Sequence, residues 1–308
     1  AVAAVAIAAV SLAPSGGDRR PGALDLARLS SASAAEVFGL TAEAAREQPA
    51  LVPGPGQVLY FHLTHTTDDG SRSERAEIEE WIGPDGRGVR LDGLSGASSS
   101  SSDGGTRFEP LRIEFDAAAG TDRGLTVTDS WRAILTLDEL EAVPTEPRAA
   151  LRYVRRHVAA SAGTTQRSRA GEHRILGDGF LVLASISSML MEAPLTGEQR
   201  AALLEVVADA PRWYRSDGTA AIEVVNEGRS SAADGTEGIL IQAAMRLSPV
   251  EAAMLGSERR EIGYGVLLDP DGGAVLETRV GFGAGRPPAI RITSRALELR
   301  DAADLPAP

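Results

Sequence analysis

The spacing of apolar residues predicts one helix, a block of strands, a block of helices and a second block of strands, in that order. Apolar residues at helical spacing run from Ala34 to the residue before Pro49. Residues 57–67 are rich in β-branched and aromatic side chains, which is typical of a strand. Pro and Gly at 53–56 separate the two segments, so the helix ends before the strand begins.

Two predicted hairpins indicate an antiparallel sheet. Residues 75–82 and 89–91 flank the sequence Gly-Pro-Asp-Gly at 83–86, and residues 268–276 contain a second Pro-Asp-Gly. Such a tip suits a type I turn followed by a residue with positive φ. Strands joined by short turns pair antiparallel, whereas parallel strands need long crossovers.

Between the hairpins, the chain is predicted to be irregular and then helical. A serine-rich loop occupies 96–105. A helix is expected to begin with Thr145 as N-cap and Pro147 in its first turn, and 161–177 is expected to be irregular. Residues 180–191 predict a buried helix, and Thr196-Gly-Glu-Gln199 is a capping box for the next helix. Strands are predicted to resume at 221–225, 238–241, 263–268, 274–282 and 290–299. This order predicts an α+β fold in which one curved antiparallel sheet carries helices on its concave face.

The N-terminal segment has a different character. Residues 1–13 are uncharged and small or apolar, and the run is shorter than the roughly 20 residues that cross a bilayer. It is interpreted as the outer end of a truncated transmembrane helix, with the apolar core of a secretory signal and an Ala-rich helix of a soluble protein as the alternatives. Residues 14–33 are then expected to be a linker, and 34–308 an extracytoplasmic domain of a single-pass membrane protein.

Composition excludes several kinds of chemistry. The 308 residues contain no cysteine, and all 31 basic residues are arginine. A lysine nucleophile, a P-loop lysine, a thiolate metal site and a disulfide are therefore impossible. A net charge of −12 argues against a nucleic-acid partner, because a protein that neutralises phosphates needs a cationic surface.

The histidines and acidic motifs do not predict a metal or catalytic site. His62 and His65 are three apart, and residues at that spacing point to opposite faces of a strand. His157 and His173 are expected at the surface. Asp269-Pro-Asp271 is interpreted as a turn, because the calcium-loop pattern has Val280 where it needs an acid.

Other motifs are interpreted in the same structural way. The glycines at 281–285 are followed by Arg and two Pro where a dinucleotide site needs a helix, so they are expected to form a loop. No Gly-x-Ser-x-Gly sequence occurs, which removes support for an esterase-type nucleophile. Arg152, Arg155 and Arg156 are expected on the solvated face of a helix opposite the apolar stripe of Leu151, Val154 and Val158.

The tryptophans are the most informative aromatic residues in a chain with only 4% aromatic content. Trp81, Trp131 and Trp213 are expected either to anchor the core or to line an apolar cavity, with the core favoured. A sheet closed on one face by apolar helices commonly leaves a groove that accepts an acyl chain.

Several segments together resemble a known family. They are Ser33–Val37, Gln48-Pro49, the Gln57 to Tyr60 strand, the Glu80 to Arg87 hairpin, Val143–Pro147 and Leu267–Gly272. The sequence resembles actinobacterial single-pass membrane proteins of unknown function that are often encoded beside extracytoplasmic-function sigma factors. The resemblance implies an exported domain similar in plan to the lipoprotein-carrier half-barrel, and it implies no catalytic residues.

The expected function is therefore binding without catalysis. The domain is expected to sit outside the membrane and to bind a hydrophobic ligand or an envelope protein, in a role linked to sigma-factor-dependent envelope sensing. No catalytic, cofactor-binding or metal-ligating residue is assigned, and no cofactor is expected. The alternatives are an envelope hydrolase that uses a pair of acidic residues and a purely structural interaction domain.

Overall fold

The computed structural model describes residues 26–68, 72–98, 106–107, 111–116, 137–164, 167–210, 223–246, 261–269, 272–282 and 290–306. Its helices are α1 (Leu26–Ser31), α2 (Ala34–Arg46), α3 (Leu137–Glu141), α4 (Pro147–Thr164), α5 (Arg167–Glu192) and α6 (Gly197–Ala208). Its strands are β1 (Gln57–Asp68), β2 (Arg72–Ile82), β3 (Arg87–Ser98), β4 (Thr106–Arg107), β5 (Leu111–Asp116), β6 (Glu223–Ser231), β7 (Glu237–Arg246), β8 (Glu261–Leu268), β9 (Val275–Phe282) and β10 (Ile290–Asp301). A short 3₁₀ helix, η4 (Ala302–Asp304), follows β10.

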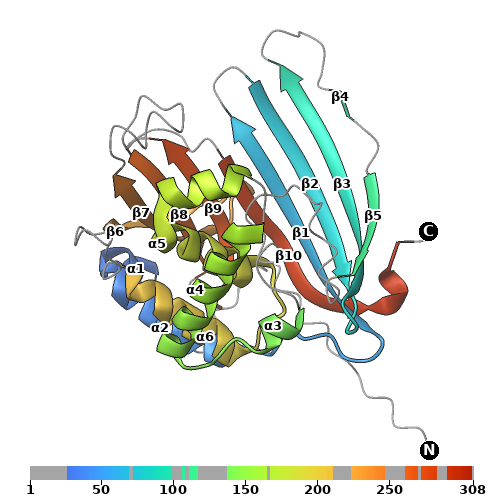
Figure 1. Ribbon diagram of the computed structural model, residues 1–308, viewed down its shortest axis with the longest axis horizontal. Helices are drawn as coiled ribbons and strands as arrows, with labels where there is room; N and C mark the ends of the chain where they lie inside the picture. The colour runs from blue at the N-terminus through green and yellow to red at the C-terminus, as the bar shows by residue number, and fades with distance from the viewer. Residues whose placement is uncertain are drawn as a thin grey trace, which may run out of the picture.

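The described strands form one antiparallel sheet that is not closed into a barrel. Its order is β4-β3-β2-β1-β10-β9-β8-β7-β6, and β5 pairs with β3 beside β4. The sheet therefore consists of two antiparallel meanders joined along β1 and β10, with helices α3 to α6 inserted between them in sequence (Figure 1). The prediction of an α+β fold with a large antiparallel sheet is confirmed.

Both predicted hairpins are present, and each closes with a glycine at positive φ. In the first, the Gly86 N–H donates to the Gly83 carbonyl (3.0 Å) and φ of Gly86 is 80°. In the second, the Gly273 N–H donates to the Asp269 carbonyl (3.1 Å) and φ of Gly273 is 70°. Glycine suits these positions because it has no Cβ to clash in the left-handed region. The turn interpretation of Asp269 is thereby confirmed, whereas Asp271 lies outside the described residues.

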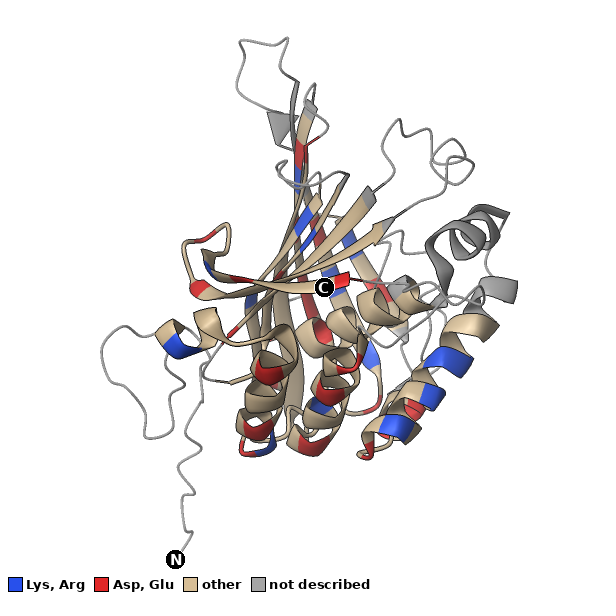
Figure 2. Ribbon diagram, turned by 90° about the vertical axis from the view of Figure 1, so that its left-hand side faces the viewer, with Lys and Arg blue, Asp and Glu red and all other residues tan. Residues whose placement is uncertain are grey.

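The helices cover one face of the sheet, which we call the helix face (Figures 1 and 2). Leu59, Phe61 and Leu63 of β1 belong to this face and join the helices in one continuous apolar core. Because side chains alternate along a strand, Val58 and Tyr60 lie on the opposite side, which we call the outer face. Within the helical layer, α2 packs on α6, while α5 packs on β9 and β10 and α1 on β6.

Cap chemistry explains where two helices begin. Thr196 and Gln199 form the predicted capping box of α6, with the Gln199 N–H donating to Thr196 Oγ1 (3.2 Å). Gln199 Nε2 also donates to the carbonyl of Val143 (3.1 Å), which ties the end of α3 to α6. For α4 the prediction of Thr145 as N-cap was wrong. Glu146 is the residue that caps it, because its Oε2 accepts from the Ala149 N–H (2.7 Å) and so satisfies a free donor of the first turn.

Two sequence-based predictions of irregular chain were wrong. Residues 161–164 end α4, and 167–177 are the first part of α5, where helical continuity with the apolar 180–191 segment outweighs the weak local pattern. The strand β5 was missed, although Leu111, Ile113 and Phe115 alternate with polar residues as a strand requires. The short β4 strand has no comparable signal in its sequence.

The folded region begins before the predicted boundary at residue 34. Part of the expected linker, residues 26–31, forms α1, and Leu29 of that helix is fully buried. Asn226 of β6 fixes α1, because its Nδ2 donates to the carbonyls of Leu29 (2.8 Å) and Ala32 (2.7 Å). The apolar segment 1–13 lies outside the described residues. Among the described helices, none combines the length and apolar character that a membrane crossing requires.

Candidate functional site

A small aromatic cluster lies on the outer face, separate from the main core. Val58 and Tyr60 of β1 and Trp81 of β2 are buried there, with Leu91, Ala296 and Ala302 packed against them. The centroids of the Tyr60 and Trp81 rings lie 5.1 Å apart, and the rings are tilted by 47° relative to each other, within the range of separations at which aromatic rings attract. Trp81 thus serves a core, as predicted, but a second core on the face opposite the helices.

Polar groups around Tyr60 fix this cluster. The Tyr60 hydroxyl donates to Glu79 Oε2 (3.1 Å), and the guanidinium carbon of Arg300 lies 3.4 Å from the Tyr60 ring centroid. Burial, together with the negative charge and hydrogen bond of Glu79, raises the pKa of the Tyr60 phenol to about 12. Tyr60 therefore stays neutral at physiological pH.

The segment 301–306 crosses the outer face and covers the cluster. The Ala302 N–H donates to the Gly56 carbonyl (2.9 Å), which holds the start of the segment beside β1. Its far end is fixed by Arg112 of β5, whose Nη1 donates to the Pro306 carbonyl (3.0 Å). Between these two points lies Leu305, which remains 39% exposed. We call residues 301–306 the outer strap.

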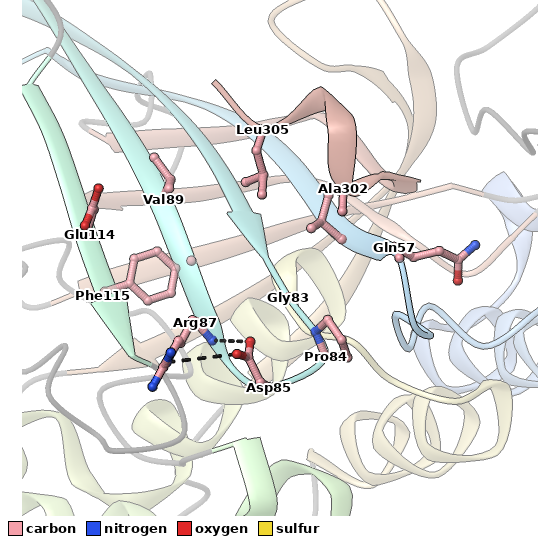
Figure 3. Close-up of a pocket in the computed structure, with 13 residues that line it drawn as sticks. Gln57, Gly83, Pro84, Asp85, Arg87, Val89, Glu114, Phe115, Ala302 and Leu305 are labelled. Carbon is pink, nitrogen blue, oxygen red and sulfur yellow. Dashed lines mark hydrogen bonds and ion pairs between the residues drawn. The ribbon is translucent and has the colours of Figure 1, made fainter. Parts of the chain in front are cut away.

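A groove of about 660 Å³ lies between the outer strap and the tip of the β2–β3 hairpin. Its walls are mainly apolar. Ala302 and Leu305 come from the outer strap, Val58 and Val89 from the outer face of the sheet, and Phe115, which also packs against the main core, from the end of β5 (Figure 3). The volume falls in the usual range for small-molecule sites. The groove, the outer strap and the aromatic cluster together form the candidate site.

Glycine at position 88 is necessary for the shape of this groove. A Cβ on Gly88 would lie 2.3 Å from Phe115 Cζ and 2.4 Å from the Trp81 carbonyl oxygen. Only glycine allows the Phe115 ring to lie against β3 at this point.

The charged residues at the groove lie at its rim. Arg87 and Asp85, in the hairpin tip, form an exposed ion pair with 4.0 Å between Nε and Oδ2, and the Arg87 N–H donates to Asp85 Oδ1 (3.1 Å) (Figure 3). Glu114 of β5 lies across the groove from them. An apolar floor with charges only at the rim favours a ligand with a hydrocarbon body.

Two buried nitrogen atoms on this face lack a hydrogen-bond partner among the described residues. They are Trp81 Nε1 and His62 Nε2. The strand register places them close together, because Tyr60 pairs with Trp81 and His62 with the neighbouring Glu79. A buried donor without an acceptor costs roughly 1–3 kcal/mol of folding free energy. The buried polar atoms of this part of the sheet are therefore less completely hydrogen-bonded than those of a purely structural core.

The described histidines are held by the fold in different ways. Within the described residues, no group of three or more His, Asp or Glu side chains is arranged to hold a metal ion. Burial lowers the pKa of His65. The surface prediction for His157 was wrong: its side chain is 16% exposed, its Nδ1 lies 3.0 Å from the Tyr153 carbonyl, and its Nε2 lies 3.4 Å from Glu139 Oε1. It links α4 to α3.

The remaining predicted residues fall into two groups. Arg152, Arg155 and Arg156 are exposed on α4, on the side opposite the buried Val154 and Val158, as predicted (Figure 2). The other candidates cannot be placed, because they or their side chains lie outside the described part of the chain: Trp131, Trp213, His173 and the glycines at 283 and 285.

Sequence reasoning placed the expected ligand groove on the helix face, whereas the larger space lies on the outer face. Among the described residues, the main core packs on the helix face, and the space beside the ends of α5 and α6 measures about 80 Å³. The residues that were missed are Phe115, Ala302 and Leu305. The alternation in 111–116 could have identified Phe115, but a strap across a sheet has no local sequence signal.

No protein-family model, no curated protein and no solved structure matches this chain.

Proposed function

We propose that this chain is a binding domain without catalytic activity, and that its outer-face groove holds the hydrocarbon chain of a lipid-like ligand. The observation that carries the proposal is the groove itself, about 660 Å³ with a mainly apolar lining. Burying one methylene group of such a chain contributes about 0.8 kcal/mol. A micromolar affinity corresponds to about 8 kcal/mol, so about ten buried methylenes along Val58, Val89 and Leu305 would be needed to supply it, before the cost of ordering the ligand is counted.

The rim supports a ligand with a polar end. Asp85 and Arg87 neutralise each other, so the rim does not demand a particular charge from the ligand. A headgroup can therefore remain in water beside the hairpin tip while the chain lies under Leu305. This arrangement resembles neither an acid pair aimed at a substrate nor a closed pocket that surrounds a whole ligand.

The proposal extends to where the domain acts. The apolar segment 1–13 supports attachment to a membrane by one helix, with the folded domain outside the cytoplasm. A domain held at a membrane surface would meet lipids and envelope proteins at high local concentration. Binding of such a ligand or partner would then be the input of sigma-factor-linked envelope sensing.

We also propose that the fold follows the plan of the lipoprotein-carrier half-barrel. An open, all-antiparallel sheet with helices on one face supports a plan like that of the lipoprotein-carrier half-barrel. The site is proposed on the opposite face from the one that such a carrier plan would use. Superposition of an experimental structure on a carrier protein would test this similarity.

The ligand can be tested by displacement of a fluorescent fatty acid from the purified domain. We expect saturable binding that oleate displaces, and loss of at least tenfold in affinity in Leu305→Arg, because a guanidinium placed in the apolar groove must be desolvated when the chain enters. Native mass spectrometry of the same protein would show whether a lipid is retained from the cell.

The matched control is Leu111→Arg. Leu111 is 62% exposed on β5 and does not line the groove. The same substitution there should leave probe affinity unchanged. Equal affinity of Leu305→Arg and wild type would reject the groove as the site, and turnover of envelope glycans by the domain would contradict a binding role without catalysis.

A further inference from the structure

A second space lies in the sheet, where β9 and β10 separate. The two strands pair from Val280 with Ile290 to Glu277 with Thr293, and then β10 continues with β1 alone. The β1–β10 register shifts at this point, which leaves Arg295 in a bulge. A partly open space of about 80 Å³ occupies the seam between the strands and the ends of α5 and α6.

Arg200 reaches this space from the first turn of α6. Its side chain is buried, with the residue only 4% exposed. The acceptor that the described chain offers it is the Leu195 carbonyl, 3.4 Å from Nη2, and no carboxylate of the described residues lies within ion-pair distance. A guanidinium has five N–H donors, and among the described residues one of those of Arg200 has a protein acceptor.

Other arginines of this region have acidic partners. Arg295 Nη1, at the same seam, lies 3.0 Å from Asp234 Oδ2. Arg279 and Arg291 both bond to Glu277 nearby. A buried charge without a counter-ion is costly, because no attraction to an opposite charge repays its desolvation. Burial accordingly lowers the pKa of Arg200 to about 10, which still leaves the group charged at neutral pH.

The residues that line the space limit which ligand can bind to Arg200. Most of its side chains are apolar, among them Leu51, Leu190, Met191 and Leu297. Asp234, which is paired with Arg295, and Asp269 also line it, and they repel a dianion such as phosphate about twice as strongly as a monoanion. A space of about 80 Å³ corresponds to two or three waters at about 30 Å³ each. A planar monoanion with a short alkyl end fits these three limits.

We propose that Arg200 is the anchor of a second binding site, which takes a short-chain carboxylate at the seam between β9 and β10. A guanidinium can donate two parallel N–H···O bonds to the two oxygens of one carboxylate. The alkyl end then lies against Leu190, Met191 and Leu297. This site is separate from the outer-face groove and does not depend on the proposed function.

Calorimetric titration and thermal unfolding of the intact protein with acetate, propionate and butyrate would test the site. We expect saturable binding and a concentration-dependent rise in Tm for wild type, with chloride at equal ionic strength giving neither. In Arg200→Met, which keeps a long side chain without the charge, the carboxylate-dependent rise in Tm should disappear. Without carboxylate, this variant should be at least as stable as wild type, because an unpaired buried charge has been removed.

Two further variants separate the site from general effects. Arg152→Met removes the same charge from the exposed face of α4 and should respond to carboxylate as wild type does. Ser294→Leu keeps Arg200 and fills the space, so it should also lose the response. An equal response of wild type and Arg200→Met would overturn the proposal, as would the absence of saturable binding to wild type. Arg200-dependent binding of octanoate that is tighter than that of butyrate would overturn the assignment to short-chain acids.

Discussion

The two halves of the outer face differ in how completely their buried polar groups are hydrogen-bonded. In the β9–β10 half, Glu277 is fully buried, and its carboxylate accepts bonds from Arg279 (2.7 Å), Arg291 (2.6 Å), Thr293 (2.7 Å) and the Ala233 N–H (2.8 Å). In the β1–β3 half, the aromatic cluster leaves Trp81 Nε1 without an acceptor in the described chain. One half is a closed polar network, and the other combines an unsatisfied donor with a groove. Completed networks stabilise, whereas incomplete ones mark places where a ligand can contribute.

The charge state of Glu277 shows how complete its network is. Burial alone would raise the pKa of this carboxyl, but the bonds from Arg291, Thr293, Arg279 and Ala233 outweigh burial and lower it. The network joins β9, β10 and the β6–β7 turn through one side chain. Both oxygens of the Glu277 carboxylate are engaged by bonds from within the fold, so its function is structural.

Among single substitutions in the two halves, removal of Glu277 should have the largest effect. Glu277→Ala leaves two arginines, a hydroxyl and a backbone N–H without their acceptor, and we expect a loss of about 3 kcal/mol in the free energy of unfolding. Urea denaturation of wild type and variant would measure it. If the loss were as small as that of a surface pair, the contrast between the two halves would fail.

The control for this experiment is Glu237→Ala. Glu237 also pairs with an arginine, Arg229, on the neighbouring strand, but both side chains are about half exposed (46% and 57%). Solvent screens such pairs, so the midpoint of denaturation should hardly move. The comparison therefore isolates burial from the mere presence of an ion pair.

Acidification should act on the same network. The folded protein keeps Glu277 charged to lower pH than the unfolded chain does, so unfolding takes up a proton as the pH falls through the ordinary pKa of 4.5. The stabilisation is complete above that value and is lost as the pH falls through the lower pKa of the folded state. The unfolding free energy of Glu277→Gln should accordingly depend less steeply on pH in this window than that of wild type.

Much of the fold could be predicted because its signals are local. The β-branched and aromatic composition marked β1, the Pro-Asp-Gly sequences marked both hairpins, and Thr196 with Gln199 marked the start of α6. The site could not be predicted in the same way. The outer strap contacts β5 through Arg112 and Pro306, which are 194 residues apart in sequence, and nothing near either residue encodes that contact. From the sequence alone, Arg200 cannot be distinguished from an exposed charged residue of a helix, and only the fold shows that it is buried.

Substitution of two glycines should have effects of opposite sign. Gly88→Ala places a methyl group within 2.4 Å of the Trp81 carbonyl, a backbone atom that cannot easily move, and within 2.3 Å of Phe115 Cζ. We expect a loss of about 1–3 kcal/mol in unfolding free energy, together with weaker binding of the fatty-acid probe. Gly39, in the middle of α2, has nothing within 4 Å of the added carbon, so Gly39→Ala should stabilise by about 0.5–1 kcal/mol. Equal effects would mean that the Phe115 contact does not shape the groove.

The smallest expected effect is a shift in the titration of Tyr60. The folded protein favours the neutral phenol, so this group contributes stability that is complete below its ordinary pKa of 10 and is lost as the pH rises towards about 12. Because Glu79 raises the pKa by its charge and its hydrogen bond, Glu79→Gln should move the titration of Tyr60 downwards. Glu298 contributes less, so Glu298→Gln should move it less far in the same direction. Phenolate absorbance, taken as the difference between each protein and its Tyr60→Phe counterpart, would isolate Tyr60 from the other three tyrosines. A phenol that titrates at the ordinary value in wild type would mean that water reaches Tyr60 beneath the outer strap, and the aromatic half would then be an open surface.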